Sequence, residues 1–197
     1  MTPEGFRLYP EYFDRSDQEA LAAMVFEAAR IAPFYQPSTP GGGTMSVAMT
    51  NCGKLGWITD RGGYRYAARH PQTGAPWPPI PPPLLGLWAD LTDSGPPPDA
   101  CLVNLYRAGA RMGLHQDRDE RDFSHPVISV SLGDTAIFRI GTARRGPTAS
   151  MKLGSGDVCR LAGPARLAFH GIDRVIAGSS SLIPGGGRLN LTLRRAS

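Results

Sequence analysis

The sequence predicts an α+β protein that is mainly β, with short antiparallel strands arranged as a sandwich or barrel. From Cys101 onward, apolar runs rich in Val, Ile and Leu are separated by Gly-containing turns, with little helix between them, which is typical of such folds. Near the N-terminus, apolar residues recur at helical spacing instead. With 197 residues, 41% of them apolar, the chain can bury one substantial core, so we expect a single domain over residues 1–197.

A start signal and a periodic pattern indicate the N-terminal helix. Ser16, followed three residues later by Glu19, has the spacing of a capping box. Apolar residues then recur at three- and four-residue intervals, at Leu21, Met24, Val25, Ala28 and Ala32. We expect this helix to pack against a sheet.

The remaining elements follow from strand patterns and from the position of proline. Strands are predicted at 45–50, at 55–59 and 64–67 on either side of the turn DRGG, and then at 101–106, 127–133, 135–141, 156–163, 165–172 and 187–195. Proline is concentrated at 71–83 and 95–98, which excludes central strands there. A short helix is predicted between them, at 84–91.

Composition narrows the class of partner and compartment. The net charge is +4, and all basic residues except Lys54 and Lys152 are arginines, which gives a weak preference for an anionic partner such as nucleic acid or a carboxylate. Cys52, Cys101 and Cys159 are far apart and form no C-x-x-C motif, so neither a disulfide framework nor a zinc finger is indicated. No secretory signal and no long apolar run is present, so we expect a soluble cytoplasmic protein.

Three side chains could share one metal. Alternate residues of a strand lie on the same face, which brings together His115 and Asp117 in LHQD, and His170 and Arg166 in ARLAFHGI. A jelly roll that juxtaposes these strands would supply two imidazoles and one carboxylate, the facial ligand set of non-haem Fe(II) oxygenases. Considered separately, His115 and Asp117 more often form a surface pair, and His170 is more often a core histidine.

The C-terminal strand supports the metal interpretation. Its sequence RLNLTLR places Leu189, Leu191 and Leu193 on one face, and Arg188, Asn190, Thr192 and Arg194 on the other. A row of guanidinium and amide donors opposite an apolar face suits an anion in a pocket, and a dicarboxylate fits well. Arg188 and Arg194 are separated by roughly 20 Å along an ideal strand, so we expect them to contact opposite ends of such a ligand.

Several segments together resemble the AlkB family of Fe(II)- and 2-oxoglutarate-dependent nucleic-acid demethylases, above all its bacterial DNA-repair members. The resemblance extends from about Ser38 to Arg195. It is carried by TPGGGTMSVAMTNCGKLGW, HPQTGAPWPP, CLVNLYRAGARMGLHQDRDE, VISVSLGDTAIFRIG, FHGI and RLNLTLR. The runs NLYRAGARMGLHQDRDE and RLNLTLR are specific to this family, whereas H-x-D alone is shared by many oxygenases.

The resemblance implies a set of ligands and an architecture. His115, Asp117 and His170 match the iron ligands. Arg188 matches the arginine that pairs with the distal carboxylate of 2-oxoglutarate, Arg194 the arginine near its metal-bound end, and Asn104, Tyr106 and Asn190 match further contacts to this cosubstrate. The implied fold is a double-stranded β-helix, or jelly roll, with N-terminal helices in residues 1–38, a nucleotide-recognition lid in 39–70 and the catalytic core in 100–195.

The resemblance also implies substrate contacts. Trp57 and Tyr64 align with lid residues that contact the base and the backbone, and Asp119 with the acid that recognises the base. Glu120 could contact the base or could be a solvated turn residue or a supporting partner. Arg145 is a candidate for phosphate contact, with further arginines and one lysine at Lys54, Arg61, Arg65, Arg69, Arg111 and Arg118.

The implied reaction is an oxidative demethylation of N-alkylated nucleobases, of the 1-methyladenine and 3-methylcytosine type. It would consume O2, convert 2-oxoglutarate to succinate and release the methyl group as formaldehyde. We expect a monomer acting on alkylated DNA, or on RNA. Two alternatives stay open from the sequence: a non-catalytic jelly roll that binds nucleic acid, and an oxygenase of a protein or small molecule. The preferred lesion, and single strand against duplex, are also open.

Overall fold

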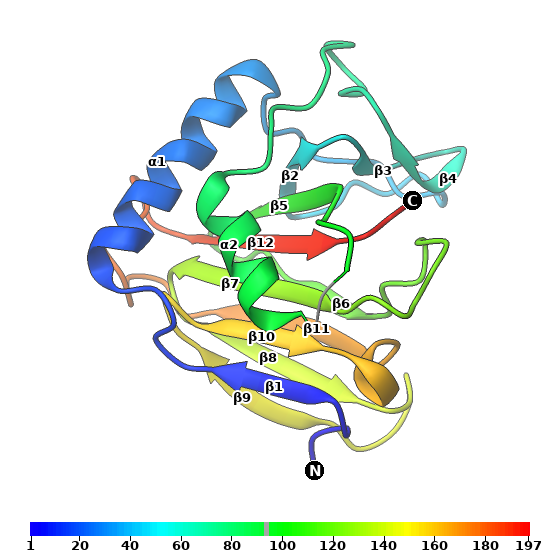
Figure 1. Cartoon of the computed structure of the whole chain (residues 1–197), viewed down its shortest axis with the longest axis vertical. Coiled ribbons are helices and arrows are strands. Elements are labelled where there is room, and N and C mark those ends of the chain that lie inside the picture. The colour runs from blue at the N-terminus through cyan, green and yellow to red at the C-terminus, as the bar shows by residue number, and fades with distance from the viewer. Residues whose placement is uncertain (93–94) are drawn as a thin grey trace.

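Two antiparallel sheets face each other in the computed structural model, which describes residues 1–92 and 95–197 (Figure 1). The six-stranded sheet has, in spatial order, β1 (Phe6–Tyr9), β10 (Val158–Leu161), β7 (Val127–Gly133), β12 (Arg188–Arg194), β5 (Ala100–Tyr106) and β2 (Ala48–Gly53). The four-stranded sheet has β6 (Met112–His115), β11 (Phe169–Val175), β8 (Ala136–Gly141) and β9 (Ala149–Leu153). A separate hairpin consists of β3 (Gly56–Asp60) and β4 (Gly63–Ala67). The predicted fold class, a mainly β jelly roll, is confirmed.

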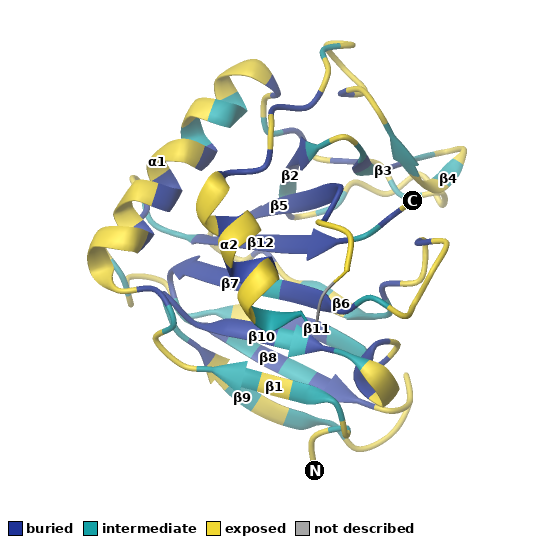
Figure 2. Ribbon diagram, in the orientation of Figure 1, coloured by how far each residue is buried: buried dark blue, intermediate teal, exposed yellow. Residues whose placement is uncertain are grey.

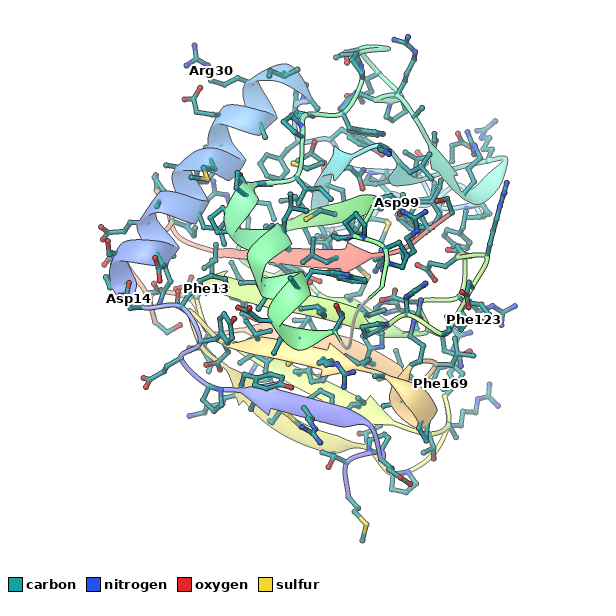
Figure 3. The ribbon with its side chains drawn as sticks, viewed as in Figure 1. Phe13, Asp14, Arg30, Asp99, Phe123 and Phe169 are labelled. Atoms are coloured by element: carbon teal, nitrogen blue, oxygen red, sulfur yellow. The ribbon has the colours of Figure 1, made fainter. Side chains whose placement is uncertain are left out.

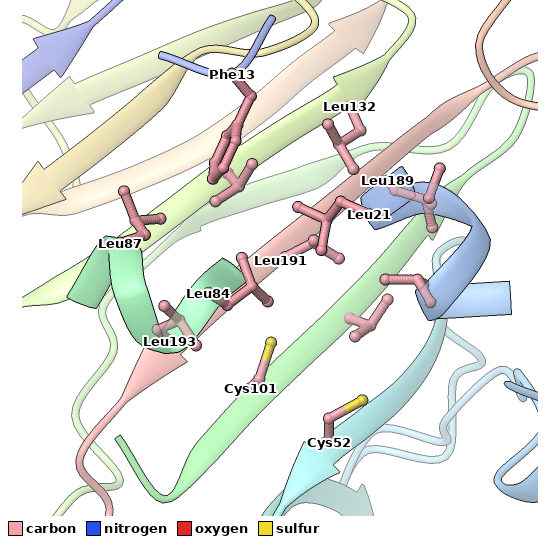
Figure 4. Packing of buried hydrophobic residues seen from close by; sticks show 14 of the residues in the cluster. Phe13, Leu21, Cys52, Leu84, Leu87, Cys101, Leu132, Leu189, Leu191 and Leu193 are labelled. Carbon is pink, nitrogen blue, oxygen red and sulfur yellow. The ribbon is translucent and has the colours of Figure 1, made fainter. Parts of the chain in front are cut away.

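Two helices cover the outer face of the six-stranded sheet. These are α1 (Arg15–Ile31) and α2 (Pro82–Leu91). Leu21 of α1 and Leu84 of α2 belong to one buried cluster with the leucines of β12 (Figure 4). The apolar face of RLNLTLR is therefore buried under the helices, and its polar face points into the space between the sheets. Figure 2 shows that β5 and β12 are buried along their whole length.

Helix α1 begins earlier than its predicted capping box. Asp14 is the N-cap, and its Oδ1 accepts a hydrogen bond of 2.9 Å from Asp17 N. The prediction that Ser16 and Glu19 form a capping box is wrong, because an aspartate caps as well as a serine. With the helix starting at Arg15, Glu19 lies one turn away from Arg15 and pairs with it instead, at 2.7 Å.

Pairing adds two strands that the sequence analysis did not predict. Strand β1 pairs with β10, so the N-terminal segment contributes to the sheet as well as providing α1. Strand β9 pairs with β8. The strand predicted over 165–172 is shorter than expected because Gly163–Ala165 forms a 3₁₀ turn and β11 begins at Phe169. Arg166 therefore does not share a strand face with His170, and that prediction is wrong.

A second apolar cluster fills the space between the two sheets, with Val127, Ile140 and Ile172 among its members. Polar side chains interrupt this cluster along β5 and β12, where the candidate site lies. Among the described residues, no helix is long and apolar enough to cross a membrane.

Candidate active site

A cavity of about 530 Å³ lies between the sheets and is lined from both of them. The four-stranded sheet contributes His115 and His170, and the six-stranded sheet contributes Arg188 and Asn190. The predicted metal cluster and the predicted anion-binding row thus face the same space.

The metal cluster forms where β6 and β11 pair. His115 lies opposite His170 across the two strands. Asp117 follows β6 in the adjoining loop, with Oδ1 3.9 Å from His115 Nε2 and Oδ2 3.7 Å from His170 Nε2. The donor atoms of all three side chains lie within 4.8 Å of one another, which suits one metal ion.

Both imidazoles are held in the orientation that metal binding requires. His115 Nδ1 lies 2.9 Å from Gly113 O, and His170 Nδ1 lies 3.0 Å from Ala168 O. Because a carbonyl oxygen can only accept, each Nδ1 must carry the proton, which leaves the Nε2 lone pair free for a metal. Gly171 allows this close pairing, because a Cβ there would lie only 2.6 Å from Met112 O.

Burial and local charges keep Asp117 and His170 in their metal-binding forms. Burial raises the pKa of Asp117, but Arg194 at 2.8 Å and the two imidazoles outweigh it and hold this pKa well below its usual range. Burial, with a contribution from His115, lowers the pKa of His170 to about 4. A carboxylate and a neutral imidazole are the forms that coordinate metals. Asp117 Oδ2 is buried without a hydrogen-bond partner among the described residues, so a cation fits here.

The opposite wall of the cavity offers unpaired donors. Asn190 of β12 lies beside Asn104 of β5. Arg188 is 1% exposed, donates from Nη2 to Ser131 Oγ at 2.9 Å, and has its guanidinium carbon 5.2 Å from the centre of the Tyr106 ring. Its Nε and Nη1 have no partner within the described part of the chain. Since a buried guanidinium without an anion is costly, these donors fit a carboxylate group.

Of the three roles left open for Glu120, its contacts in the structure are those of a supporting partner. It is 6% exposed and does not line the cavity. Its Oε2 lies 3.1 Å from Arg166 Nη2, while its Oε1 accepts from Tyr66 OH and lies 3.5 Å from Arg194 Nε. Both carboxylate oxygens therefore lie next to buried guanidinium groups, and Glu120 supports the cavity-lining Arg194 from outside the cavity lining.

The hairpin β3–β4 contributes an aromatic pair to the cavity mouth. Trp57 and Tyr64 both line the cavity, with stacked rings whose centres are 5.6 Å apart. Asp119 also lines the cavity, and its Oδ2 accepts from Trp57 Nε1 at 2.7 Å. These three predicted substrate contacts are therefore together at one opening.

Asn51 fixes the hairpin and was not predicted. Its Nδ2 donates to Trp57 O at 3.1 Å, and its Oδ1 accepts from Trp57 N at 3.0 Å. Gly56 makes room for this contact, because a Cβ there would lie 2.4 Å from the Trp77 ring and 2.7 Å from the Asn51 side chain. A buried asparagine inside a strand was the available sequence signal, since such an amide needs partners.

Two other basic residues were candidates for phosphate contact. Arg145 is exposed and does not line the cavity, whereas its neighbour Arg144 does, and phosphate contact by Arg145 stays a prediction. Arg65 pairs with Asp60 of the same hairpin at 2.7 Å, so its charge is already balanced. Three methionines of the cavity wall were also missed: Met45, Met49 and Met112.

The sequence is similar to those of known proteins. Residues 5–194 match the 2OG-Fe(II) oxygenase superfamily. The chain is 63% identical over 193 residues, 98% of its length, to the alpha-ketoglutarate-dependent dioxygenase AlkB homolog of Caulobacter vibrioides, 88% of which is covered. The chain belongs to the AlkB family. Over 108 residues, 49% of this chain and 24% of the relative, it is 44% identical to a DNA N(6)-methyladenine demethylase of Arabidopsis thaliana.

The AlkB-family architecture extends over the whole fold. The solved structure of OsALKBH1 superposes with a TM-score of 0.84 and 31% sequence identity, covering 99% of this chain and 98% of the other. Members of the 2OG-Fe(II) oxygenase superfamily use Fe(II), 2-oxoglutarate and O2, and this AlkB-family chain is such a dioxygenase. The buried, incompletely paired Asp117 and Arg188 are consistent with these cofactors.

Proposed function

We propose that this dioxygenase removes N-methyl groups from nucleobases of the 1-methyladenine and 3-methylcytosine type and thereby reverses alkylation damage in DNA. The observation that carries the proposal is one cavity that joins a His-Asp-His cluster, an incompletely paired buried arginine, and an aromatic pair with a carboxylate. The printed name of the Arabidopsis relative, a DNA demethylase, is in agreement.

His115, Asp117 and His170 are proposed to hold Fe(II). Iron bound there supplies the activation of O2, which no protein side chain can provide. Arg194 keeps Asp117 ionised and oriented through its contact of 2.8 Å. The carbonyls of Gly113 and Ala168 fix both imidazole rings.

The cosubstrate is proposed to span the cavity from the metal cluster to Arg188. The free Nε and Nη1 of Arg188 would donate to the distal carboxylate, with Tyr106 beside the guanidinium. Asn104 and Asn190 lie between these ends, and Asn104 Oδ1 is a further buried acceptor without a partner among the described residues. Arg194 lies at the other end, next to Asp117.

The damaged base is proposed to bind with the aromatic pair Trp57 and Tyr64 on one side and the metal cluster on the other. A methyl group inside a duplex cannot reach a buried metal, so the base must be flipped out or already single stranded. Methylation at N1 of adenine or N3 of cytosine makes the base cationic, and the Asp119 carboxylate at the cavity wall would favour this form over the neutral base. Its hydrogen bond to Trp57 holds the carboxylate beside the aromatic pair.

Oligomeric state, lid, location and substrate class are also proposed. We propose that the protein acts as a monomer. The hairpin and the chain around it, residues 39–70, are proposed as the nucleotide-recognition lid. We propose a cytoplasmic location and DNA as substrate, with RNA as a second substrate to be tested.

The decisive experiment measures formaldehyde and succinate from an oligonucleotide carrying one N-methylated base, with Fe(II), ascorbate and 2-oxoglutarate. We expect turnover by the wild type and none by His115→Ala or Asp117→Ala, whereas Glu27→Ala on the exposed face of α1 serves as a folded control. Absence of turnover on every methylated base would overturn the proposal. Chelator-resistant binding without 2-oxoglutarate consumption would identify a non-catalytic binder, and turnover of a protein or small molecule alone would identify another oxygenase.

A further inference from the structure

Two exposed apolar side chains belong to residues that are linked to the cavity wall and have no part in the proposed function. Phe123 and Leu167 expose 39% and 37% of their surface. Leu167 is linked to the cavity wall by Gln116, a lining residue whose Nε2 donates to Leu167 O at 2.6 Å. Phe123 contacts Arg166, which donates to the backbone oxygen of the lining residue Asp117. Each residue is therefore one intermediate contact away from the cavity wall.

The Phe123 ring packs against the guanidinium group of Arg166, which is buried and hydrogen-bonded to three partners. The guanidinium carbon of Arg166 lies 5.4 Å from the ring centre. Arg166 is 3% exposed and donates to His125 O at 2.8 Å, to Asp117 O at 2.7 Å and to the Glu120 carboxylate at 3.1 Å. An arginine fixed at three points holds the ring by a cation–π contact, which leaves ring surface for a ligand at a small entropic cost.

Two arginines close to Phe123 in the chain have donors available for phosphates. Arg118 and Arg121 are exposed, and neither has an ion pair within residues 1–92 and 95–197. The nearby acids have partners of their own: Asp119 accepts from Trp57, Asp122 accepts from Ser124 and lies 3.7 Å from His125, and Glu120 is paired with other arginines. The guanidinium donors of Arg118 and Arg121 are thus available to phosphate groups.

We propose that Phe123, together with Leu167, is a stacking platform for the nucleobase next to the lesion in the same strand. Arg118 and Arg121 contact the phosphates on either side of that base. Aromatic rings alternating with cations are the usual means of holding single-stranded nucleic acid. Figure 3 shows Phe123 at the edge of the molecule opposite α1, on the loop between β6 and β7. The inference rests on the proposed function, because the lesion itself occupies the cavity.

Stacking is tested directly with 2-aminopurine, whose fluorescence falls when it stacks. The base is placed in turn at each of the three positions on either side of the lesion, and the holoenzyme is titrated without O2. We expect quenching at one neighbouring position on one side only. Phe123→Ala should abolish that quenching and weaken binding about tenfold, since a base stacked on an aromatic is worth about 1–3 kcal/mol. Phe123→Trp should retain it.

A second measurement separates stacking from damage to the loop. The ratio of kcat/KM for a methylated oligonucleotide to that for the methylated mononucleotide should fall about tenfold in Phe123→Ala. The control Leu85→Ala, an exposed side chain on α2, should leave the ratio unchanged. A fall of both rates by the same factor in Phe123→Ala, or position-independent quenching, would overturn the inference. Because the titration needs no turnover, it distinguishes failure of the platform from failure of the demethylase proposal.

Discussion

At the residue scale, the site depends on buried charges that have only some of their partners. Arg188 uses one of its nitrogens on Ser131, and the other two side-chain nitrogens lack partners among the described residues. Glu120, in contrast, is completely engaged by Arg166, Arg194 and Tyr66. The two residues should therefore respond differently to substitution: Arg188 through ligand binding, and Glu120 through stability.

Arg188→Ala should raise the KM for 2-oxoglutarate by about 30-fold or more, because loss of one member of a buried charge pair typically costs about 2–5 kcal/mol. Arg188→Lys should be intermediate, because an ammonium keeps the charge but not the planar fork. Steady-state kinetics with varied 2-oxoglutarate measures both. The control is Arg15→Ala, whose side chain pairs with Glu19 on the exposed face of α1, and an unchanged KM in Arg188→Ala would remove this residue from the cosubstrate site.

Glu120→Gln should lower the free energy of unfolding of the metal-free protein by about 3–5 kcal/mol, because the buried Arg166 loses the one carboxylate it pairs with among the described residues, while Arg194 keeps Asp117. Urea denaturation followed by circular dichroism measures the change. Glu27→Gln, which removes an exposed ion pair with Arg30, should lie within error of the wild type. Wild-type stability in Glu120→Gln would mean that the carboxylate does not balance these arginines.

At the scale of elements, the sequence predicted those helices and strands whose own residues carry a clear hydrophobic pattern, and missed strands that depend on a partner. The helix at 84–91 and the strands around Asn104, Ser129 and Asn190 were predicted because hydrophobic alternation and proline position specify them. Strands β1 and β9 were missed because their sequences, FRLY and ASMKL, contain no Val, Ile or Thr, and each is held by its partner strand. Such strands depend on context rather than on intrinsic propensity.

The start of α1 provides a direct test of which residue caps the helix. Asp14→Ala should destabilise the protein by about 1 kcal/mol, the usual cost of losing an N-cap side chain. Ser16→Ala should have little effect, since the Ser16 hydroxyl has no capping bond in the structure. Thermal denaturation of the two variants measures the difference. A larger loss in Ser16→Ala than in Asp14→Ala would restore the capping box expected from the sequence.

At the scale of the whole molecule, the site is complete only when both sheets are in place. The motif H-x-D and the later His170 predicted the metal cluster, but the expectation that Asp117 shares a strand face with His115 is wrong, because β6 ends at His115. The alternation along β12 predicted the anion row because it is periodic in sequence. The contacts of Glu120, Arg166 and Asn51 were not predictable, because their partners lie on distant segments. Family resemblance supplied the match of motifs but not these supporting contacts.

Ligands that contact both sheets should stabilise the fold as a unit. Mn(II) in place of Fe(II) should raise the Tm. N-oxalylglycine, a 2-oxoglutarate analogue, should raise the Tm further, because at 100 times its Kd a ligand adds about 2.7 kcal/mol to the free energy of unfolding. EDTA should reverse the first increase. Differential scanning fluorimetry measures both steps. In Arg188→Ala, Mn(II) should still raise the Tm, but N-oxalylglycine should no longer raise it further. Equal stabilisation of the wild type and Arg188→Ala by N-oxalylglycine would contradict this prediction.

The position of β12 has a consequence for how the protein is made. This strand lies between β5 and β7, yet it is synthesised long after both of them. Until it is inserted, the six-stranded sheet exists as two pieces, β2 with β5 and β7 with β10 and β1, and each piece exposes an unpaired edge. A nascent chain that has already assembled His115, Asp117 and His170 still lacks Arg188, Asn190 and Arg194. Insertion of β12 is therefore the one step that both closes the two open edges of the sheet and adds the anion row to the metal cluster.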